Sequence, residues 1–270
     1  MALSATDSRN KMNVFILWIL CGSVPQSKET PMPAPITDKP PILDRDFAEK
    51  FMIAVDRPLD YGVYFLIHDW WEVATPEAID AYMEELHGLP GAKEFLSERF
   101  IAEPLTVESL EHYGPGTLGA AYRDFVVENN LIENFGRDYR AFQKQLMASG
   151  KLKRMPEDMA YMMVRGTQLH DFMHVLTGYG ATIPGELALA SYYLSQMRSP
   201  YHAIRLAVTM AHTAFVAPKG VVSSMDAFVD GWHYGRNSRN INFMRWEERL
   251  AEPLASLQAE MNLRQIAKAA

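Results

Sequence analysis

The chain has 270 residues, a formal net charge of −7 and 48% hydrophobic residues. These values are typical of a folded globular protein and exclude a disordered or collagen-like chain. The acidic balance argues against a nucleic-acid partner, because binding to phosphates needs a basic face. With one cysteine, Cys21, the chain can form neither a disulfide framework nor a cysteine-rich zinc motif.

Residues 1–41 are predicted to be an N-terminal tail with a proline-rich linker. The apolar run at 14–20 is too short to cross a bilayer, which requires about 20 apolar residues. The run has the outline of a signal-peptide core, but no small-x-small cleavage site follows it, so we favour an unstructured tail. Residues 31–41 contain five prolines, as expected for an extended linker. The folded domain is therefore expected to span 42–270.

The rest of the chain is predicted to be all-α and to form a single multi-helix domain. Apolar residues recur at helical spacing from residue 44 onward, and the best candidate for a strand, 63–67, is weak. Pro76 stands where a helix start tolerates proline, and Thr117 follows a break at 113–116. The predicted helices cover 44–56, a segment from 76 to about 86, 117–130, 137–148, 157–177, 186–198, 201–217, 224–248 and 253–267.

The stretch 159–218 is predicted to form the buried centre. Its sixty residues contain five charged side chains, well below the 22% average of the whole chain. Buried charges need a partner or a metal ion. The five are Arg165, Asp171, Glu186, Arg198 and Arg205. Both carboxylates lie close in sequence to histidines, which directs attention to these positions.

His170, Asp171 and His174, with Glu186 following after eleven intervening residues, form the one constellation that suggests chemistry. The two histidines are four residues apart and share a helix face, with Asp171 on its flank. Glycines at 178, 180 and 185 predict a turn that returns Glu186 toward the imidazoles. The same face forms a buried polar stripe of Met163, Thr167, His170, His174 and Thr177.

Two neutral imidazoles and two carboxylates suit a divalent cation of borderline hardness. We therefore predict a metal site; the competing interpretation is a pair of core histidines with a helix-capping glutamate. A zincin motif would require Glu at position 171. A di-iron bundle would require two Glu-x-x-His motifs, and Glu84 to His87 is the one found. The pair His68-Asp69 leaves a metal-dependent phosphohydrolase open as a further alternative.

The pattern His-Asp-x-x-His, followed by eleven residues and then Glu, resembles the signature of the Coq4 family, which acts in ubiquinone (coenzyme Q) biosynthesis. The segment 169–180, LHDFMHVLTGYG, is close to the bacterial form of the family motif. The segment 114–122, GPGTLGAAY, resembles the family's Gly-Ser/Thr-Leu-Gly-x-x-Tyr segment, and 234–236 and 246–254 resemble its C-terminal helices. The resemblance covers 95–265. Pro184 departs from the expected pattern but is not a predicted ligand.

The resemblance implies an all-α fold with an apolar groove that binds a polyprenyl lipid. It implies a divalent metal held by His170, Asp171, His174 and Glu186, with zinc the first choice and iron, manganese or magnesium as alternatives. The implied activity is a carboxy-lyase reaction: the C1 carboxylate is removed, oxidatively, from a polyprenyl-hydroxybenzoate precursor. The alternative is a non-catalytic prenyl-lipid-binding scaffold that organises the ubiquinone biosynthetic complex.

The expected partners are a polyprenylated quinone precursor, other ubiquinone biosynthesis proteins and a second copy in a homodimer. The expected location is peripheral, on the cytoplasmic face of the membrane, or on the matrix side of the mitochondrial inner membrane in a eukaryote. A candidate membrane patch comprises Phe47, Phe51, Met52 and Ile53, although core packing is favoured for it.

Several further residues are assigned from sequence. Six methionines are candidates to line the lipid groove or to fill the core: Met159, Met162, Met163, Met173, Met197 and Met210. Arg236 and Arg239 could meet a carboxylate or phosphate, but an exposed basic face is favoured. The histidines at 202, 212 and 233 are expected to be structural.

Overall fold

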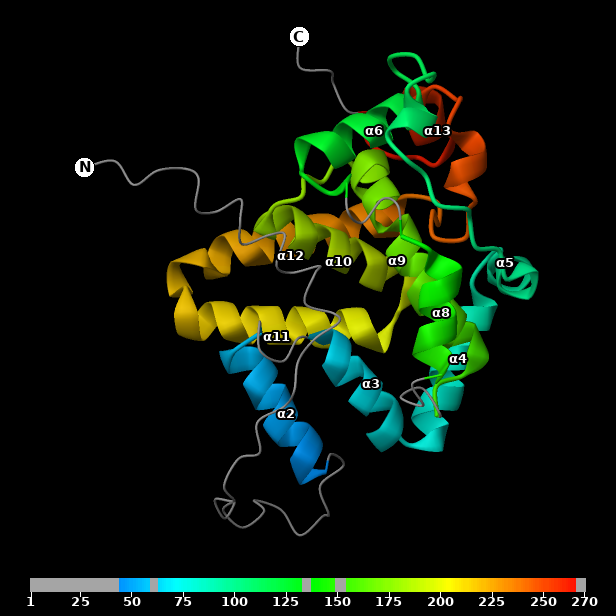
Figure 1. The fold of residues 1–270 in the computed structure, drawn as a ribbon. Coiled ribbons are helices and arrows are strands. Elements are labelled where there is room, and N and C mark those ends of the chain that lie inside the picture. Colours follow the sequence, from blue (N-terminus) through cyan, green and yellow to red (C-terminus); the bar gives the residue numbers. More distant parts are fainter. Residues whose placement is uncertain (1–43, 59–62, 133–136, 149–153, 266–270) are drawn as a thin grey trace.

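The computed structural model describes residues 44–58, 63–132, 137–148 and 154–265. They form one all-α domain in which no segment of the described ranges is a strand, as predicted (Figure 1). The predicted tail and linker at 1–41 lie outside the described residues. The helices are α2 (Arg45–Asp56), α3 (Val63–Val73), α4 (Pro76–Gly88), α5 (Ala92–Glu98), α6 (Leu118–Glu128), α8 (Tyr139–Ala148), α9 (Glu157–Thr177), α10 (Ile183–Met197), α11 (Pro200–Val216), α12 (Val221–Asn237) and α13 (Leu254–Glu260), with short 3-10 turns η2 (Glu108–Leu110), η3 (Pro218–Gly220) and η4 (Trp246–Arg249).

Side-chain caps fix several helix starts that the sequence predicted. The Asp44 carboxylate accepts a hydrogen bond from the backbone N–H of Phe47, and the Thr117 hydroxyl accepts one from Ala120. Each cap satisfies an N–H group that would otherwise lack a partner in the first helical turn. Thr182 caps α10 in the same way, and this places the start of α10 three residues before the predicted one.

Two predicted helices end earlier in the structure than the sequence predicts, and two helices, α3 and α5, are not among the predicted ones. The strand candidate 63–67 lies in α3, because a short apolar run has no periodicity that separates a strand from a buried helix. The predicted helix 224–248 ends at Asn237, since the Gln196 amide bonds to the carbonyls of Gly235 and Arg239 and holds the chain there. The predicted helix 253–267 ends at Glu260, and α5 was not predicted.

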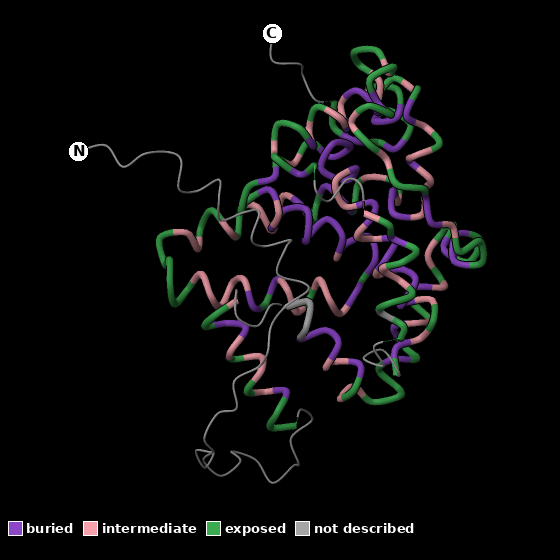
Figure 2. Tube along the Cα trace, in the orientation of Figure 1, coloured by how far each residue is buried: buried purple, intermediate pink, exposed green. Residues whose placement is uncertain are grey.

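The long helix α9 lies between the two largest hydrophobic clusters. Its first half contributes Met159, Met162 and Val164 to a cluster with α3, α4 and α5. Its second half contributes Phe172 and Met173 to a cluster with α6, α10, α12 and the C-terminal segment. Figure 2 shows the concentration of buried residues along α9 and α10. The prediction that 159–218 includes the buried centre therefore holds for these two helices.

Helices α10 and α12 pack closely because small residues meet at their contact. A Cβ atom added to Gly231 would lie 1.9 Å from the backbone oxygen of Ala188. A Cβ atom added to Gly235 would lie 2.0 Å from the Ser195 hydroxyl. Only glycine fits at these two positions, so the register between the two helices is fixed.

The predicted apolar surfaces have mixed outcomes. Four of the six methionines, at 159, 162, 173 and 197, are buried in the core clusters, and those at 163 and 210 are half-buried. The lipid groove therefore stays a prediction. In α2, Phe47 is buried in a cluster that includes Val55 and Leu66, which confirms core packing for this residue, whereas Met52 is exposed. Within the described ranges, no helix has both the length and the apolar character needed to cross a bilayer.

Candidate metal centre

A tight connection between α9 and α10 brings His170, His174 and Glu186 together. Gly178 ends α9 with a φ of +78°, a conformation that glycine adopts without strain. A Cβ atom added to Gly185 would lie 2.0 Å from the Gly180 carbonyl oxygen, so the turn can close only on glycine. Glu186 thus sits in the first turn of α10, beside the last turns of α9, as predicted.

The three side chains present their ligand atoms to one another. His174 Nε2 lies 3.3 Å from His170 Nε2 and 3.1 Å from Glu186 Oε1. His170 Nε2 lies 3.6 Å from Glu186 Oε2. Ligand atoms bound to a tetrahedral zinc ion at 2.0–2.1 Å are about 3.3 Å apart. The spacing of the three side chains therefore fits a single divalent ion.

The protonation of His174 strengthens this fit. Its Nδ1 lies 2.9 Å from the backbone oxygen of Tyr179, which can only accept, so Nδ1 carries the proton. In the neutral ring, the lone pair of Nε2 then faces the Glu186 carboxylate at 3.1 Å. Two acceptors at this distance are stable only with a proton or a cation between them. A backbone carbonyl that fixes a histidine tautomer is also a usual outer partner of metal-binding histidines.

The site is buried on one side and open on the other. The His174 side chain is 1% exposed, whereas those of His170 and Glu186 are 26% and 29% exposed. Burial alone would lower the pKa of His170, but the Glu186 and Asp171 carboxylates raise it above its ordinary value. Burial alone would raise the pKa of Glu186, but the two histidines and Arg205 hold it well below its usual range. In the metal-free protein, both shifts favour an ion pair between His170 and Glu186.

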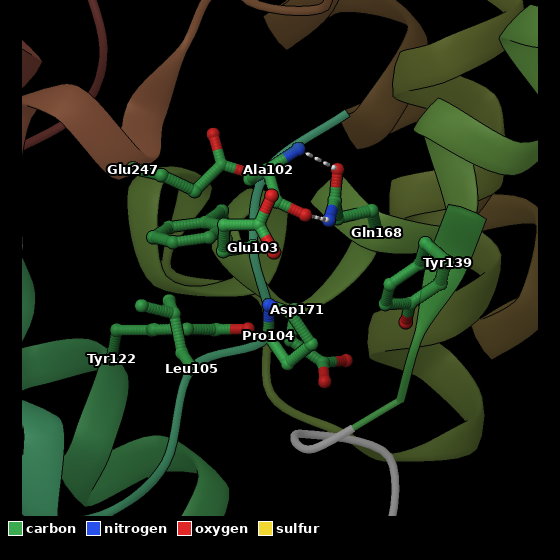
Figure 3. Close-up of a pocket in the computed structure, with 10 residues that line it drawn as sticks. Ala102, Glu103, Pro104, Leu105, Tyr122, Tyr139, Gln168, Asp171 and Glu247 are labelled. Atoms are coloured by element: carbon green, nitrogen blue, oxygen red, sulfur yellow. Dashed lines mark hydrogen bonds between the residues drawn. The ribbon is translucent and has the colours of Figure 1, made fainter. Parts of the chain in front are cut away.

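Asp171, the fourth predicted ligand, lies outside this group of three. It lines a small pocket together with Tyr122, Tyr139 and Glu247 (Figure 3). Burial raises the pKa of the Asp171 carboxyl. Burial, and after it the Asp171 charge, raises the pKa of Tyr139 to about 12. The structure thus brings together three of the four predicted ligands and places the carboxylate of Asp171 in a neighbouring pocket.

The sequence did not assign two residues that lie beside the site. Arg205, on α11, donates from Nη2 to Glu186 Oε2 at 3.1 Å. Tyr193, on α10, has its ring nearly parallel to that of His170, with 6.4 Å between the ring centroids. Arg205 was counted among the five charges of the low-charge stretch, and that was its only signal. Nothing in the spacing distinguished Tyr193 from the other apolar-face residues of α10.

The remaining candidates take structural or surface positions. His212 Nδ1 donates to the backbone oxygen of Val55 at 2.8 Å, as expected for a structural histidine. His87, of the Glu-x-x-His motif, pairs with Asp158. In the His68-Asp69 pair, His68 is buried and Asp69 bonds to Lys50 at 3.2 Å. His233, Arg236 and Arg239 are exposed.

Comparison with known proteins decides the family. The family model described as "Coenzyme Q (ubiquinone) biosynthesis protein Coq4" matches residues 72–267, which is most of the chain and includes the three-residue site. The chain belongs to the Coq4 family. The match confirms the resemblance expected from 169–180 and connects the chain to ubiquinone biosynthesis.

Curated Coq4 proteins share modest identity with this family member. The protein named ubiquinone biosynthesis protein COQ4, mitochondrial, of Yarrowia lipolytica is 24% identical over 195 residues, covering 71% of this chain and 69% of that protein. The protein of the same name from Arthroderma otae is 25% identical over 196 residues, covering 70% and 66%. The match to its Ajellomyces capsulatus counterpart, at 28% identity, spans 40% of this chain and 35% of that protein.

A solved structure shares the Coq4-like fold. The crystal structure of a candidate ubiquinone biosynthesis protein from Nostoc punctiforme superposes with a TM-score of 0.62 at 16% identity. The superposition covers 81% of this chain and 95% of that one. At this identity the likeness supports the all-α fold and carries no conclusion about activity.

Proposed function

We propose that this Coq4-family chain is a metal-dependent enzyme of ubiquinone biosynthesis that removes the C1 carboxylate of a polyprenyl-hydroxybenzoate precursor. One observation carries the proposal: His170, His174 and Glu186 converge at ligand spacing on a site that stays partly open to solvent. Membership of the family supports the pathway and the class of precursor.

The donor set favours zinc. Two imidazole nitrogens and one carboxylate are a ligand set of catalytic zinc sites, which leave a further position open for water or substrate. Iron, manganese and magnesium are the alternatives. A bound ion would supply a Lewis acid for a carboxylate or ring oxygen of the substrate. His170 and His174 would hold the ion from α9, and Glu186 would hold it from α10.

The residues around the site have supporting roles in this proposal. The Tyr179 carbonyl fixes the His174 tautomer that leaves Nε2 free to bind, and Arg205 holds Glu186 ionised. Loss of carbon dioxide from the ring requires stabilisation of the charge that is left behind. In the oxidative form of the reaction, a hydroxyl group from water would replace the carboxylate at C1, and dioxygen would take up the two electrons and two protons that are released, so that carbon dioxide and hydrogen peroxide leave.

A second candidate function is the non-catalytic prenyl-lipid-binding scaffold. A row of exposed apolar side chains along one face of α12 favours it: Val222, Met225, Val229 and Trp232. A scaffold would use such a face to contact another ubiquinone biosynthesis protein, a second copy of the chain or the membrane surface. Both candidate functions are compatible with peripheral membrane association and with the predicted partners.

Release of labelled carbon dioxide separates the two candidates. The zinc-loaded and the iron-loaded protein would each be incubated with a short-chain prenyl-hydroxybenzoate carrying ¹³C in its carboxyl group, in the presence of dioxygen. The enzymatic proposal predicts labelled carbon dioxide from the wild type and none from Glu186→Gln. Binding of the substrate without carbon dioxide release under either metal would support the scaffold and contradict the decarboxylase.

A further inference from the structure

We infer that Arg205, Tyr193 and His202 form a subsite that binds the anionic aromatic head of the ligand beside the three-residue metal group, with Arg205 donating to its carboxylate. The three residues come from two helices, α10 and α11. The inference deepens the proposed function and rests on it for the identity of the ligand. The chemical class it names is an aromatic carboxylate with a hydroxyl group on the ring.

Arg205 has unused donors at the open side of the site. Among the described residues, its guanidinium makes one hydrogen bond, from Nη2 to Glu186. Its side chain is 22% exposed, so a ligand can reach it. A guanidinium has five N–H donors in a planar fork that matches a carboxylate in two-point contact. One contact to Glu186 leaves the fork able to bind a second anion.

Two buried polar atoms near Arg205 lack partners within the described residues. They are the Tyr193 hydroxyl and His202 Nδ1. Tyr193 as a whole is 7% exposed. A buried polar atom without a partner is rare in a native protein and indicates a missing ligand or water. A ring hydroxyl of the ligand could both donate and accept, and so could pair with these atoms.

Three aromatic rings, those of Tyr193, His202 and His170, lie next to one another at the proposed subsite. The Tyr193 and His202 rings stack with centroids 4.9 Å apart and an interplanar angle of 19°. The Tyr193 ring is also nearly parallel to that of His170, at an angle of 16° and with 6.4 Å between the ring centroids. Burial, together with the charges of Arg205 and His170, lowers the pKa of His202 to about 3. Because this imidazole is neutral, Arg205 supplies the positive charge of the subsite.

The competing account is that Arg205 acts only on Glu186 and never touches a ligand. The two accounts differ in which ligands lose affinity when Arg205 is replaced. A contact to the ligand predicts a loss of affinity confined to ligands that carry the anion. A role confined to Glu186 predicts a change in metal binding and no discrimination between charged and uncharged ligands.

The test measures binding by calorimetry, without dioxygen, to the full-length zinc-loaded protein. The probes are 3-prenyl-4-hydroxybenzoate, the matched phenol 2-prenylphenol, which lacks the carboxylate, and inorganic phosphate. The subsite predicts that Arg205→Gln weakens the acid at least about tenfold and the phenol less than about threefold. Arg45→Gln, on an exposed arginine of α2, is the control and should change neither affinity.

Two further variants keep the test decisive. If Arg205→Gln loses zinc, Arg205→Lys keeps the charge beside Glu186 but removes the fork, and it should still weaken the acid at least about fivefold. Tyr193→Phe keeps the stacked ring and removes the hydroxyl, so it should weaken both ring ligands while phosphate is unaffected. Zinc content is measured for every variant.

Equal affinity of the acid for the wild type and for a zinc-retaining Arg205 variant would overturn the inference. Binding of phosphate in place of the acid would also overturn it, since the anion would then come from a phosphate compound. Arg205-dependent binding of the acid without any carbon dioxide release would uphold the subsite while the decarboxylase proposal fails. Carbon dioxide release that is unchanged by Arg205→Gln would uphold the decarboxylase while the subsite fails.

Discussion

Helix α9 carries two groups of charged and polar residues, and they differ in how their charges are satisfied. In its first half, the Arg165 side chain is 0% exposed and donates to both oxygens of Glu247, at 2.5 and 2.8 Å. It also donates to Gln168, which in turn bonds to the backbone of Ala102. In its second half, His174 Nε2 lies 3.1 Å from Glu186 Oε1 and 3.3 Å from His170 Nε2.

The difference separates a structural network from a site for a ligand. Around Arg165, the chain itself supplies the opposite charge and acceptors for both terminal nitrogens, although the Nε atom has no partner among the described residues. Around His174, the Nε2 atom lies 3.1 Å from the Glu186 carboxylate, and Tyr193, beside His170, has a hydroxyl without a partner in the described ranges. The burial of charge in the central helix is therefore no guide to function by itself. The two groups differ in the access of solvent, since the Arg165 and Glu247 side chains are 0% and 8% exposed and those of His170 and Glu186 are 26% and 29% exposed.

The largest expected effect is on folding, at Arg165. Replacing it in Arg165→Met leaves the Glu247 carboxylate buried without its partner, which should cost about 3–5 kcal/mol of unfolding free energy. Urea denaturation measures the loss. Arg45→Met, which removes an exposed pair with Glu49, should change stability by less than about 1 kcal/mol. A loss below about 1 kcal/mol at Arg165 would contradict the structural role of this network.

Lowering the pH should have opposite effects on two quantities that depend on the His170–Glu186 pair: it should stabilise the metal-free protein and weaken zinc binding. Since the folded-state pKa of His170 is raised, its stabilisation of the metal-free protein is present below its ordinary value of 6.5. That stabilisation is lost as pH rises through the raised pKa. Zinc must displace the same proton, so its affinity should fall about tenfold per pH unit below this pKa.

Calorimetric zinc titrations and urea denaturation between pH 6 and 8 measure the two trends. Glu186 should not contribute in this window, because its pKa is held well below its usual range and the carboxylate stays ionised. In the variant His170→Ala the rise in metal-free stability toward low pH should disappear. Zinc affinity that is independent of pH from 6 to 8 would show that the ion binds elsewhere.

The smallest expected effect is on zinc affinity in a variant of Asp171, and it tests whether this residue is a direct ligand. Because its carboxylate lies in the neighbouring pocket, Asp171→Asn should change zinc affinity by less than about tenfold, since only the charge of Asp171 would act on the ion. Competition with a chromophoric chelator measures the affinity. A loss of more than about a hundredfold would instead make Asp171 a direct ligand, as the family resemblance implies.

Local sequence signals were sufficient to predict several helix bounds and part of the candidate site. The helix 157–177 was predicted with the bounds that α9 has, because its periodicity and its terminal glycine agree. The return of Glu186 toward the histidines also followed from local signals, namely the glycines at 178, 180 and 185. These features depend on contacts between residues close in sequence, which spacing can reveal.

Contacts between distant segments were beyond prediction. The end of α12 depends on the Gln196 amide of α10, and the position of Arg205 depends on how α11 crosses Glu186. The direction of the Asp171 side chain follows from the pocket formed with Tyr122 and Glu247, residues far from it in sequence. Helical spacing predicts the helix face on which a residue lies, but it does not predict which of two neighbouring pockets the side chain enters.

Native mass spectrometry of the zinc-treated full-length chain tests the central claim most directly. The account predicts one tightly bound ion in the wild type, its loss in His174→Ala and Glu186→Gln, and its retention in Arg45→Gln. Thermal denaturation of the same samples shows whether the variants are folded. A wild type that binds no ion, or folded variants at His174 and Glu186 that keep it, would contradict the assignment of His170, His174 and Glu186 as a metal centre.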